Sequence, residues 1–367
     1  MLVSFPTQRL AHVTGQPHHD FVELYAEALD YGHIPIDVIL EEQLEENRQS
    51  EYRVIVAAGA DASYEGTGAK LLEFVQQGGT LVLGLETLQL NEYGQPTSFD
   101  KALGLSLGDA HKADIAPLLF AGHNVKAKAY RQITHDPSWQ VIARTGELPA
   151  ILEKKHGKGR IYYLGAQMQR EELRLILRSL LENLDIKPVC NILHHESMKP
   201  AYSIEVQPAQ RDGLSGYLLF NRSVTPLIVR FAPQSPINDA IMVDPLEGII
   251  HEVKDGQILL TLKPGVRQVV VSGPRETLAG RFGPLKEEGW DLALAQGKKV
   301  LDDHEAELRA KALKQQFSYP INLEQALPLD LRTVANRHFV DTVAGDGKGG
   351  WTDQGTNHLR GLEWASK

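Results

Sequence analysis

The feature that most constrains the fold is an alternation of short apolar runs with amphipathic segments through the first 185 or so residues. Ile34–Leu40, Arg53–Ala58 and Thr80–Gly84 are rich in β-branched or aliphatic residues, as buried parallel strands tend to be. His18–Gly32 and Ala69–Gln77 instead repeat their apolar residues at helical spacing and end at glycine. Repeated strand–helix units predict a parallel sheet covered by helices, with right-handed crossovers.

The pattern continues to the end of this region. Ala150–Leu164 predicts two strands, and Gln169–Leu184 predicts a helix with one leucine-rich face. We therefore predict an α/β domain with a flavodoxin-like layout.

From Lys187-Pro188 onward the pattern becomes one of short strands separated by Pro, Gly and Asp turns. We expect strands at Tyr202–Gln207, Tyr217–Asn221, Leu227–Phe231, Ile258–Leu262 and Gln268–Ser272. Such a series without intervening helices predicts a small antiparallel β-sandwich. A long charged helix is predicted over Gly289–Gln316, and Pro320 and Pro328 flank a linker beyond it.

Composition excludes several classes of function. The chain has 367 residues, enough for two or three domains, and a net charge of −9, which argues against a nucleic-acid partner. No run approaches the roughly 18 apolar residues of a membrane span, and the first residues do not form a signal peptide. The single cysteine, Cys190, excludes an internal disulfide. We expect a cytoplasmic protein with no membrane partner, no cofactor and no bound metal.

Two glycine-containing motifs invite a catalytic interpretation. Gly157-Lys-Gly159 would suit a phosphate loop only if a helix followed, and Ile161–Leu164 predicts another strand, so a hairpin turn is favoured. Gly104-Leu-Ser106-Leu-Gly108 matches the nucleophile-elbow pattern, which needs a strand before the serine and a helix after it. A short helix is predicted before Ser106 instead, and Gly108-Asp109 is predicted to be a loop.

The histidine pairs and the cysteine are weak candidates for chemistry. His18-His19 precedes Asp20 at a predicted helix start, and His194-His195 would alternate faces on a strand, so neither pair converges on one metal. Cys190 lies just past a helix, whereas a catalytic cysteine of the amidotransferase type sits on a strand-to-helix turn. We predict an inert thiol.

A glycine- and aspartate-rich loop close to the end of the chain is the remaining candidate site. Ala344–Gly355 reads AGDGKGGWTDQG, in which Asp346 and Asp353 could offer oxygen ligands to an ion and Trp351 could stack on a sugar ring. The aspartate spacing misses the EF-hand pattern. The alternative is that the glycines shape turns and Trp351 packs into a core.

Several stretches share their order and spacing with one known family. They are Ile34–Asp37, Tyr52–Ala57, Phe74–Val82, Pro149–Leu152, His156–Gly165 and Gly216–Arg222. Together they resemble the non-catalytic parts of TIM-barrel β-galactosidases of glycoside hydrolase family 42. In that family a trimerisation domain with a class I glutamine-amidotransferase-like fold follows the catalytic barrel, and a small β-domain comes next. The resemblance covers about residues 1–275. The segment from Leu329 is similar to the start of a jelly-roll module of carbohydrate-active proteins.

The resemblance implies four segments: a flavodoxin-like domain (1–187), a β-sandwich (188–275), a helical linker (276–328) and an incomplete jelly-roll-like segment (329–367). The two catalytic glutamates of the family lie on its barrel, so no catalytic residue is assigned. The implied function is the non-catalytic oligomerisation or accessory portion of a β-galactosidase-like enzyme, with a homo-oligomer or a catalytic barrel as partner. Alternatives are a carbohydrate-binding or scaffold protein, or an independent hydrolase using Ser106 or Cys190.

Overall fold

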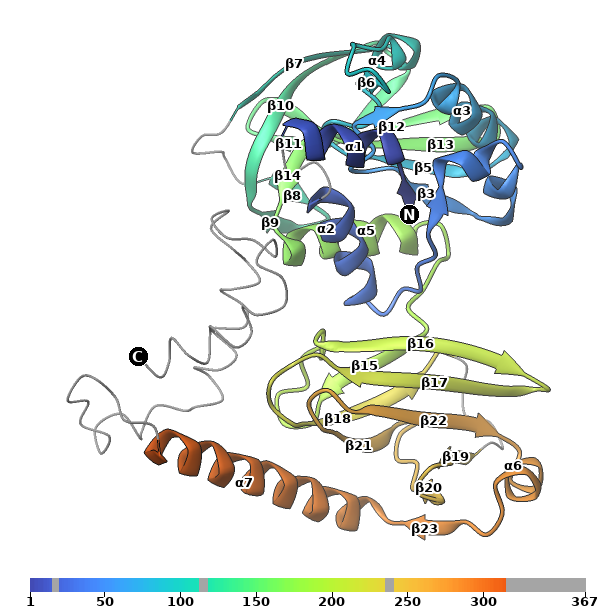
Figure 1. Ribbon diagram of the computed structural model, residues 1–367, viewed down its shortest axis with the longest axis vertical. Helices are drawn as coiled ribbons and strands as arrows, with labels where there is room; N and C mark the ends of the chain where they lie inside the picture. The colour runs from blue at the N-terminus through green and yellow to red at the C-terminus, as the bar shows by residue number, and fades with distance from the viewer. Residues whose placement is uncertain (15–19, 112–117, 235–240, 315–367) are drawn as a thin grey trace. The chain divides into compact units, whose positions relative to one another are not determined.

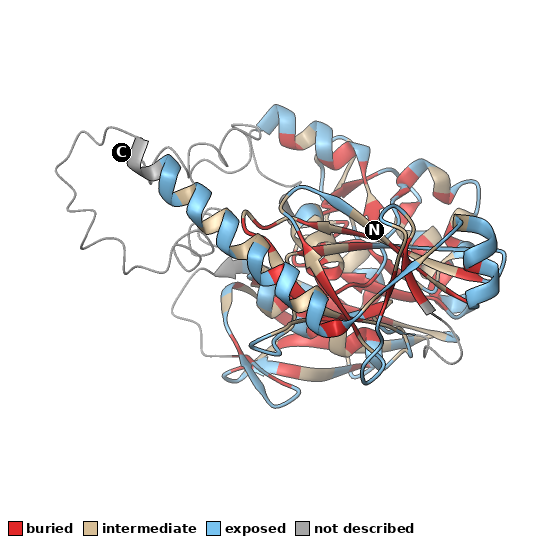
Figure 2. Ribbon diagram, turned by 90° about the horizontal axis from the view of Figure 1, so that it is seen from below, coloured by how far each residue is buried: buried red, intermediate tan, exposed pale blue. Residues whose placement is uncertain are grey.

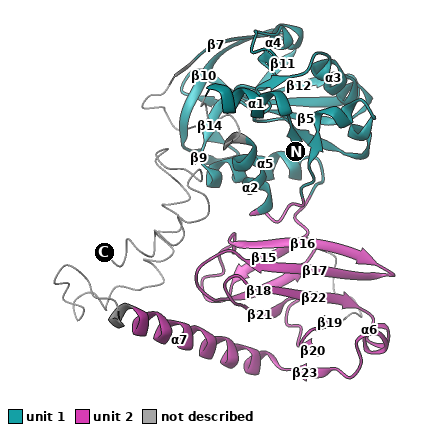
Figure 3. Cartoon of the chain, in the orientation of Figure 1, with its two compact units in different colours: residues 1–30, 36–186 teal, residues 31–35, 187–367 magenta. Residues whose placement is uncertain are grey.

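The computed structural model describes residues 1–14, 20–111, 118–234 and 241–314. The candidate residues Asp346, Trp351 and Asp353 lie outside these ranges, as do His18 and His19. The described chain forms two compact units (Figure 3). Unit 1 combines Met1–Asp30 with Ile36–Ile186, and unit 2 combines Tyr31–Pro35 with the chain from Lys187 onward.

Unit 1 is a mixed α/β structure (Figure 1). Its helices are α1 (Phe5–Thr14), α2 (Asp20–Asp30), α3 (Thr67–Gln77), α4 (Phe99–Leu103) and α5 (Arg170–Glu182), with 3-10 turns at Glu41–Leu44 and Arg48–Glu51. Its strands are β1 (Leu2–Val3), β2 (Ile39–Leu40), β3 (Val54–Val56), β4 (Ala62–Ser63), β5 (Thr80–Leu83), β6 (Leu90–Asn91), β7 (Leu105–His111), β8 (Leu118–Phe120), β9 (His123–Val125), β10 (Ala127–His135), β11 (Trp139–Thr145), β12 (Leu148–His156), β13 (Gly159–Leu164) and β14 (Ala166–Met168).

The main sheet of unit 1 has the strand order β3-β5-β13-β12-β11-β8-β9. Strands β3, β5 and β13 are parallel, and the remaining neighbours are antiparallel. β1 and β2 form a separate parallel pair, and β14-β10-β7 form an antiparallel sheet. The prediction of parallel strands alternating with helices is therefore correct for the first strands. Most of the antiparallel strands of unit 1 lie between Gly84 and Ala150, where the sequence analysis assigned no strand.

Helix α3 packs against the parallel strands β5 and β13. α3 buries Leu71, Phe74 and Val75 in a core that also contains Leu81 and Ile161 from β5 and β13. α2 and α5 pack against each other, and α5 buries the leucine-rich face that the sequence predicted. Every side chain of β5 is buried, which explains its continuous apolar sequence.

Unit 2 consists of two β-sheets with two helices. Its strands are β15 (Cys190–His194), β16 (Ile204–Arg211), β17 (Leu214–Asn221), β18 (Leu227–Pro233), β19 (Ile241–Asp244), β20 (Ile249–His251), β21 (Ile258–Leu262), β22 (Arg267–Gly273) and β23 (Lys286–Glu288), and its helices are α6 (Arg275–Phe282) and α7 (Trp290–Lys314). The sheets have the orders β15-β18-β21 and β16-β17-β22-β19-β20-β23 and share one apolar core.

The structure corrects the sequence predictions in several places. Gly108 and Asp109 belong to β7 and not to a loop. Phe5 begins a helix that was not predicted, and only Ile39 and Leu40 of the predicted strand Ile34–Leu40 pair with a neighbour. In unit 2, β20 and β23 pair in parallel, so the larger sheet is not purely antiparallel. The long charged helix is confirmed as α7, which is mostly exposed (Figure 2).

Candidate functional site

Ser106 does not lie in a nucleophile elbow. It is exposed on β7, where its register partner is Thr134 of β10. The helix α4 precedes it and the strand follows it, which is the reverse of the order that an elbow needs. The first glycine of the G-x-S-x-G pattern, Gly104, ends α4 with a φ of +76°. Strand β7 then begins directly after it, so the pattern marks a helix end followed by a strand.

Cys190 is confirmed as a structural residue. It begins β15 opposite Pro233, and its side chain is buried in the core between the two sheets of unit 2. Burial raises the pKa of the Cys190 thiol far above its usual range, so the thiolate that nucleophilic chemistry requires is disfavoured.

The second histidine pair is held by neighbours in unit 2. His194 pairs with Val229 at the end of β15, and burial lowers its pKa. His195 accepts a hydrogen bond at Nδ1 from Arg230 Nε at 3.3 Å, and burial together with the Arg230 charge lowers its pKa. Its ring lies 6.5 Å from that of Trp290. Within the described ranges no group of three or more His, Cys, Asp or Glu side chains could hold a metal ion.

The Gly157–Gly159 motif forms the predicted hairpin between β12 and β13. His156 pairs with Gly159, and Gly157 has a φ of +60°. A β-carbon on Gly159 would lie 2.1 Å from the carbonyl oxygen of Gly79, so this glycine is required by the close approach of the turn that follows α3. The motif thus brings two chain reversals into close packing, and a strand follows it where a phosphate loop would need a helix.

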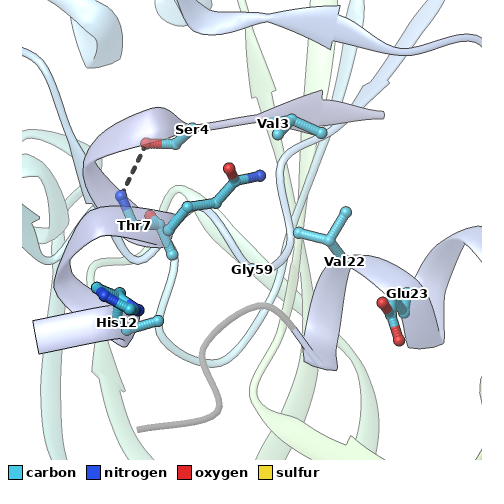
Figure 4. Close-up of a pocket in the computed structure, with 9 residues that line it drawn as sticks. Val3, Ser4, Thr7, His12, Val22, Glu23 and Gly59 are labelled. Carbon is cyan, nitrogen blue, oxygen red and sulfur yellow. Dashed lines mark hydrogen bonds between the residues drawn. The ribbon is translucent and has the colours of Figure 1, made fainter. Parts of the chain in front are cut away.

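A hollow in unit 1 lies near the carboxyl ends of β1 and β3. It has a volume of about 520 Å³ and is lined by Val3, Ser4, Thr7, Gln8, Ala11, His12, Val22, Glu23 and Gly59 (Figure 4). Ligand sites of open α/β sheets lie at the same strand ends. Its position therefore makes it a candidate site.

The hydroxyl groups of the hollow are already used by the fold. Ser4 Oγ accepts a hydrogen bond from the Thr7 backbone N–H and so caps α1, while it donates to the carbonyl of Ala62. Thr7 Oγ1 donates to the same carbonyl at 2.7 Å and accepts from the Ala62 N–H at 2.9 Å. Both hydroxyl groups therefore connect the start of α1 to β4.

A buried glutamate beside this region was missed by the sequence analysis. Glu41 Oε1 accepts hydrogen bonds from the backbone N–H of Tyr64 at 2.6 Å and from the hydroxyl of Thr67. Burial raises the pKa of Glu41, and these hydrogen bonds only partly oppose that shift. The only sequence signal was an acidic residue directly after a strand, which is also typical of an exposed turn.

No described helix has the length and hydropathy needed to cross a lipid bilayer. The described residues form an α/β unit and a β-sheet unit, and Cys190 is buried in the second.

Comparison with known proteins identifies this region. Residues 4–187, half of the chain, match the family described as the β-galactosidase trimerisation domain. The chain belongs to this family, and the resemblance inferred from its sequence is confirmed.

Two curated relatives and one solved structure place the match within larger enzymes. The β-galactosidase GalA of Bacillus licheniformis is 23% identical over 229 residues, which cover 59% of this chain and 32% of the relative. The β-galactosidase BgaA of Planococcus sp. is 23% identical over 223 residues, 55% of this chain and 31% of the relative. The crystal structure of a β-galactosidase from Bacillus circulans sp. alkalophilus matches with a TM-score of 0.53 at 18% identity, over 69% of this chain and 37% of that one. The chain spans about one third of the length of the curated relatives it matches.

Proposed function

We propose that this chain is the non-catalytic oligomerisation and accessory portion of a β-galactosidase-like glycoside hydrolase. The observation that carries the proposal is the match of residues 4–187 to the trimerisation domain, combined with coverage of only about a third of each relative. The partners of unit 1 would be further copies of the chain, and the catalytic partner would be a barrel of the kind that the relatives' family contains.

The finer fold proposed for residues 1–187 is flavodoxin-like, of the class I glutamine-amidotransferase type. Its support is the parallel order β3-β5-β13 with α3 on one side and the α2–α5 pair in the same unit. An amidotransferase of this type would carry a cysteine on a strand-to-helix turn. Cys190, the single cysteine, is buried in unit 2, so the fold would serve contacts and not amide hydrolysis.

The other expectations from the sequence stay predictions. They are the boundaries 188–275, 276–328 and 329–367, the cytoplasmic location, and the binding of a carbohydrate or ion by Asp346, Trp351 and Asp353, which lie outside the described residues.

Two measurements on the purified full chain test the proposed function. Light scattering after size exclusion should give the mass of a trimer at micromolar concentration, and a chromogenic galactoside should not be hydrolysed. A monomer at every concentration up to about 100 µM would contradict the oligomerisation role. Hydrolysis that survives rigorous purification would contradict the non-catalytic role, and the variants Ser106→Ala and Cys190→Ala would then show whether either side chain is responsible.

A further inference from the structure

An exposed aliphatic stripe follows the first crossover of unit 1. Ile36, Val38 and Leu40 are 39%, 52% and 47% exposed, whereas Ile39 between them is 2% exposed. Alternate residues of an extended segment point to the same face, so the three exposed side chains share one side of the chain and Ile39 points to the other. We call Ile36, Val38 and Leu40 the aliphatic stripe.

The stripe lies on the uncovered face of an otherwise buried pair of strands. Ile39 pairs with Leu2 of β1, and both are buried in the core that contains α3. Leu40 pairs with Val3, so these two side chains face the opposite side. Val3 itself lines the 520 Å³ hollow and is only half-buried. The strands of parallel sheets in α/β proteins are normally covered on both faces, which explains why this segment is apolar throughout. Among the residues that the structure describes, nothing covers its second face in this way.

The free edge of β2 is closed to strand addition. The N–H of Ile39 points inward and donates to the carbonyl of Met1 at 2.9 Å. The N–H groups of Val38 and Leu40, which alternate with it, are already bound by the side-chain oxygens of Asp37 at 2.8 Å and Gln43 at 2.9 Å. An incoming strand would have to break both hydrogen bonds. A partner must therefore meet the side chains of the stripe and not its backbone.

We propose that the aliphatic stripe is the surface through which unit 1 binds a second copy of this chain. The inference rests on the proposed oligomerisation and names where that contact lies. The second copy is favoured over other occupants because residues 4–187, which contain the stripe, belong to a family described by trimerisation. In a cyclic trimer each contact joins two different surfaces, so the stripe of one copy meets another part of the next.

The charge of the chain supports an apolar contact. Each copy has a net charge of −9, and Asp37, Glu42 and Glu46 beside the stripe are exposed acidic residues. Identical copies therefore repel one another at low ionic strength, and burial of aliphatic surface has to supply the attraction. Association should strengthen as salt is raised from about 20 mM to 0.5 M, the reverse of an interface held by ion pairs.

The test compares substitutions inside and outside the stripe in the full chain. Val38→Lys and Leu40→Lys should give a monomer, or weaken association at least about tenfold, in analytical ultracentrifugation. Leu119→Lys is the matched control, because Leu119 of β8 is 60% exposed in the same unit but lies outside the stripe. Val38→Thr, which keeps the shape of the side chain, should weaken association less. Far-ultraviolet circular dichroism and the melting temperature establish that each variant is folded.

A labelling experiment locates the contact without depending on a charged substitution. Cys190 is buried, so Val38→Cys introduces an exposed thiol into a chain whose own thiol is protected. Maleimide labelling of this variant should slow by at least about fivefold as the protein concentration rises through the association range. Leu119→Cys should be labelled at the same rate at every concentration.

The outcomes separate the stripe from the proposed function. If the wild type is a trimer and Val38→Lys and Leu40→Lys leave it intact, the aliphatic stripe is not the contact surface. The proposed oligomerisation role would be unaffected. Protection of Val38→Cys that does not depend on concentration would mean that the same chain covers the stripe, and it would also overturn the inference. A wild-type monomer at every concentration would overturn the proposed oligomerisation and, with it, the partner assigned to the stripe.

Discussion

Gly297 of α7 lies directly against Thr261 of β21: a β-carbon on this glycine would stand 2.4 Å from the threonine Oγ1. The same β-carbon would lie 3.0 Å from Cδ1 of Ile228 on β18. Trp290, Leu294 and the half-buried Leu301 complete this contact between helix and sheet. The first turns of α7 thus pack closely on the sheet because one position of the helix has no side chain.

The first prediction follows from that approach. Gly297→Val should destabilise unit 2 by about 2 kcal/mol, since overpacking a close contact typically costs 1–3 kcal/mol. Hydrogen exchange of residues 290–301 should accelerate, which shows that the helix has been displaced from the sheet. Gly280→Val is the control, because a β-carbon on Gly280 of α6 has open space around it. Equal melting temperatures for Gly297→Val and the wild type would contradict the described packing.

The second prediction concerns a buried amide in unit 2. Asn221 Nδ2 donates to the carbonyls of Thr225 at 2.8 Å and Leu262 at 2.9 Å, and its Oδ1 accepts from the N–H and the hydroxyl of Ser223. Because Asn221 is fully buried, Asn221→Ala would leave several polar groups without partners. We expect the free energy of unfolding to fall by about 3 kcal/mol, because each unsatisfied buried polar group costs about 1–3 kcal/mol. Chemical denaturation measures it, and the exposed Asn191→Ala in β15 should change stability by less than about 0.5 kcal/mol.

The parts of the fold that the sequence predicted are those set by local pattern. The hairpin at Gly157 and the leucine face of α5 each need only neighbouring residues, and both are confirmed. Gly108 and Asp109 were wrongly predicted to form a loop because their strand, β7, depends on pairing with β10, far along the chain. The helix from Phe5 was missed because few of its residues are buried, so it has no clear apolar period.

The candidate interaction surface could not be predicted for a related reason. The apolar sequence of Ile34–Leu40 predicts a strand that is buried on both faces. Only the structure shows that Ile39 is buried while Val38 and Leu40 are exposed. The burial of Glu41 is similarly nonlocal, since its partner Thr67 begins α3. Strand propensity does not predict which side chains of an apolar segment are buried, because tertiary neighbours decide which of its faces is covered.

The third prediction concerns an ion pair in unit 1. Arg131 on β10 donates through Nη2 to both carboxylate oxygens of Glu86, at 2.9 and 2.7 Å, and through Nη1 to Gln89. Its side chain is only 11% exposed. Removing one member of such a pair leaves the other poorly solvated, so Arg131→Met and Glu86→Gln should each cost about 2–3 kcal/mol. The double variant should lose clearly less than the sum of the two, as measured by a thermodynamic cycle. Additive losses would show that the two side chains do not interact in solution.

The fourth prediction is a pH dependence that arises at His251 of β20. His251 Nδ1 lies 3.6 Å from Glu288 Oε2 on the neighbouring strand β23. Burial lowers the pKa of His251 against the opposing effect of Asp244, and burial with the Asp244 charge raises the pKa of Glu288. Both shifts favour uncharged side chains, so desolvation outweighs the attraction between the pair.

The two groups affect stability in opposite directions. Below the ordinary histidine pKa of 6.5 the unfolded chain binds a proton at His251 and the folded chain does not, so unit 2 loses stability as the pH falls below that value. The contribution of Glu288 is complete below 4.5 and is lost as the pH rises through its raised folded-state pKa. His251→Gln should therefore flatten the decline in stability between pH 7 and pH 5. Denaturation midpoints across that range, with the exposed His123→Gln as control, measure the difference. If wild type and His251→Gln decline in parallel, His251 is not the group that titrates, and its burial as a neutral imidazole is contradicted.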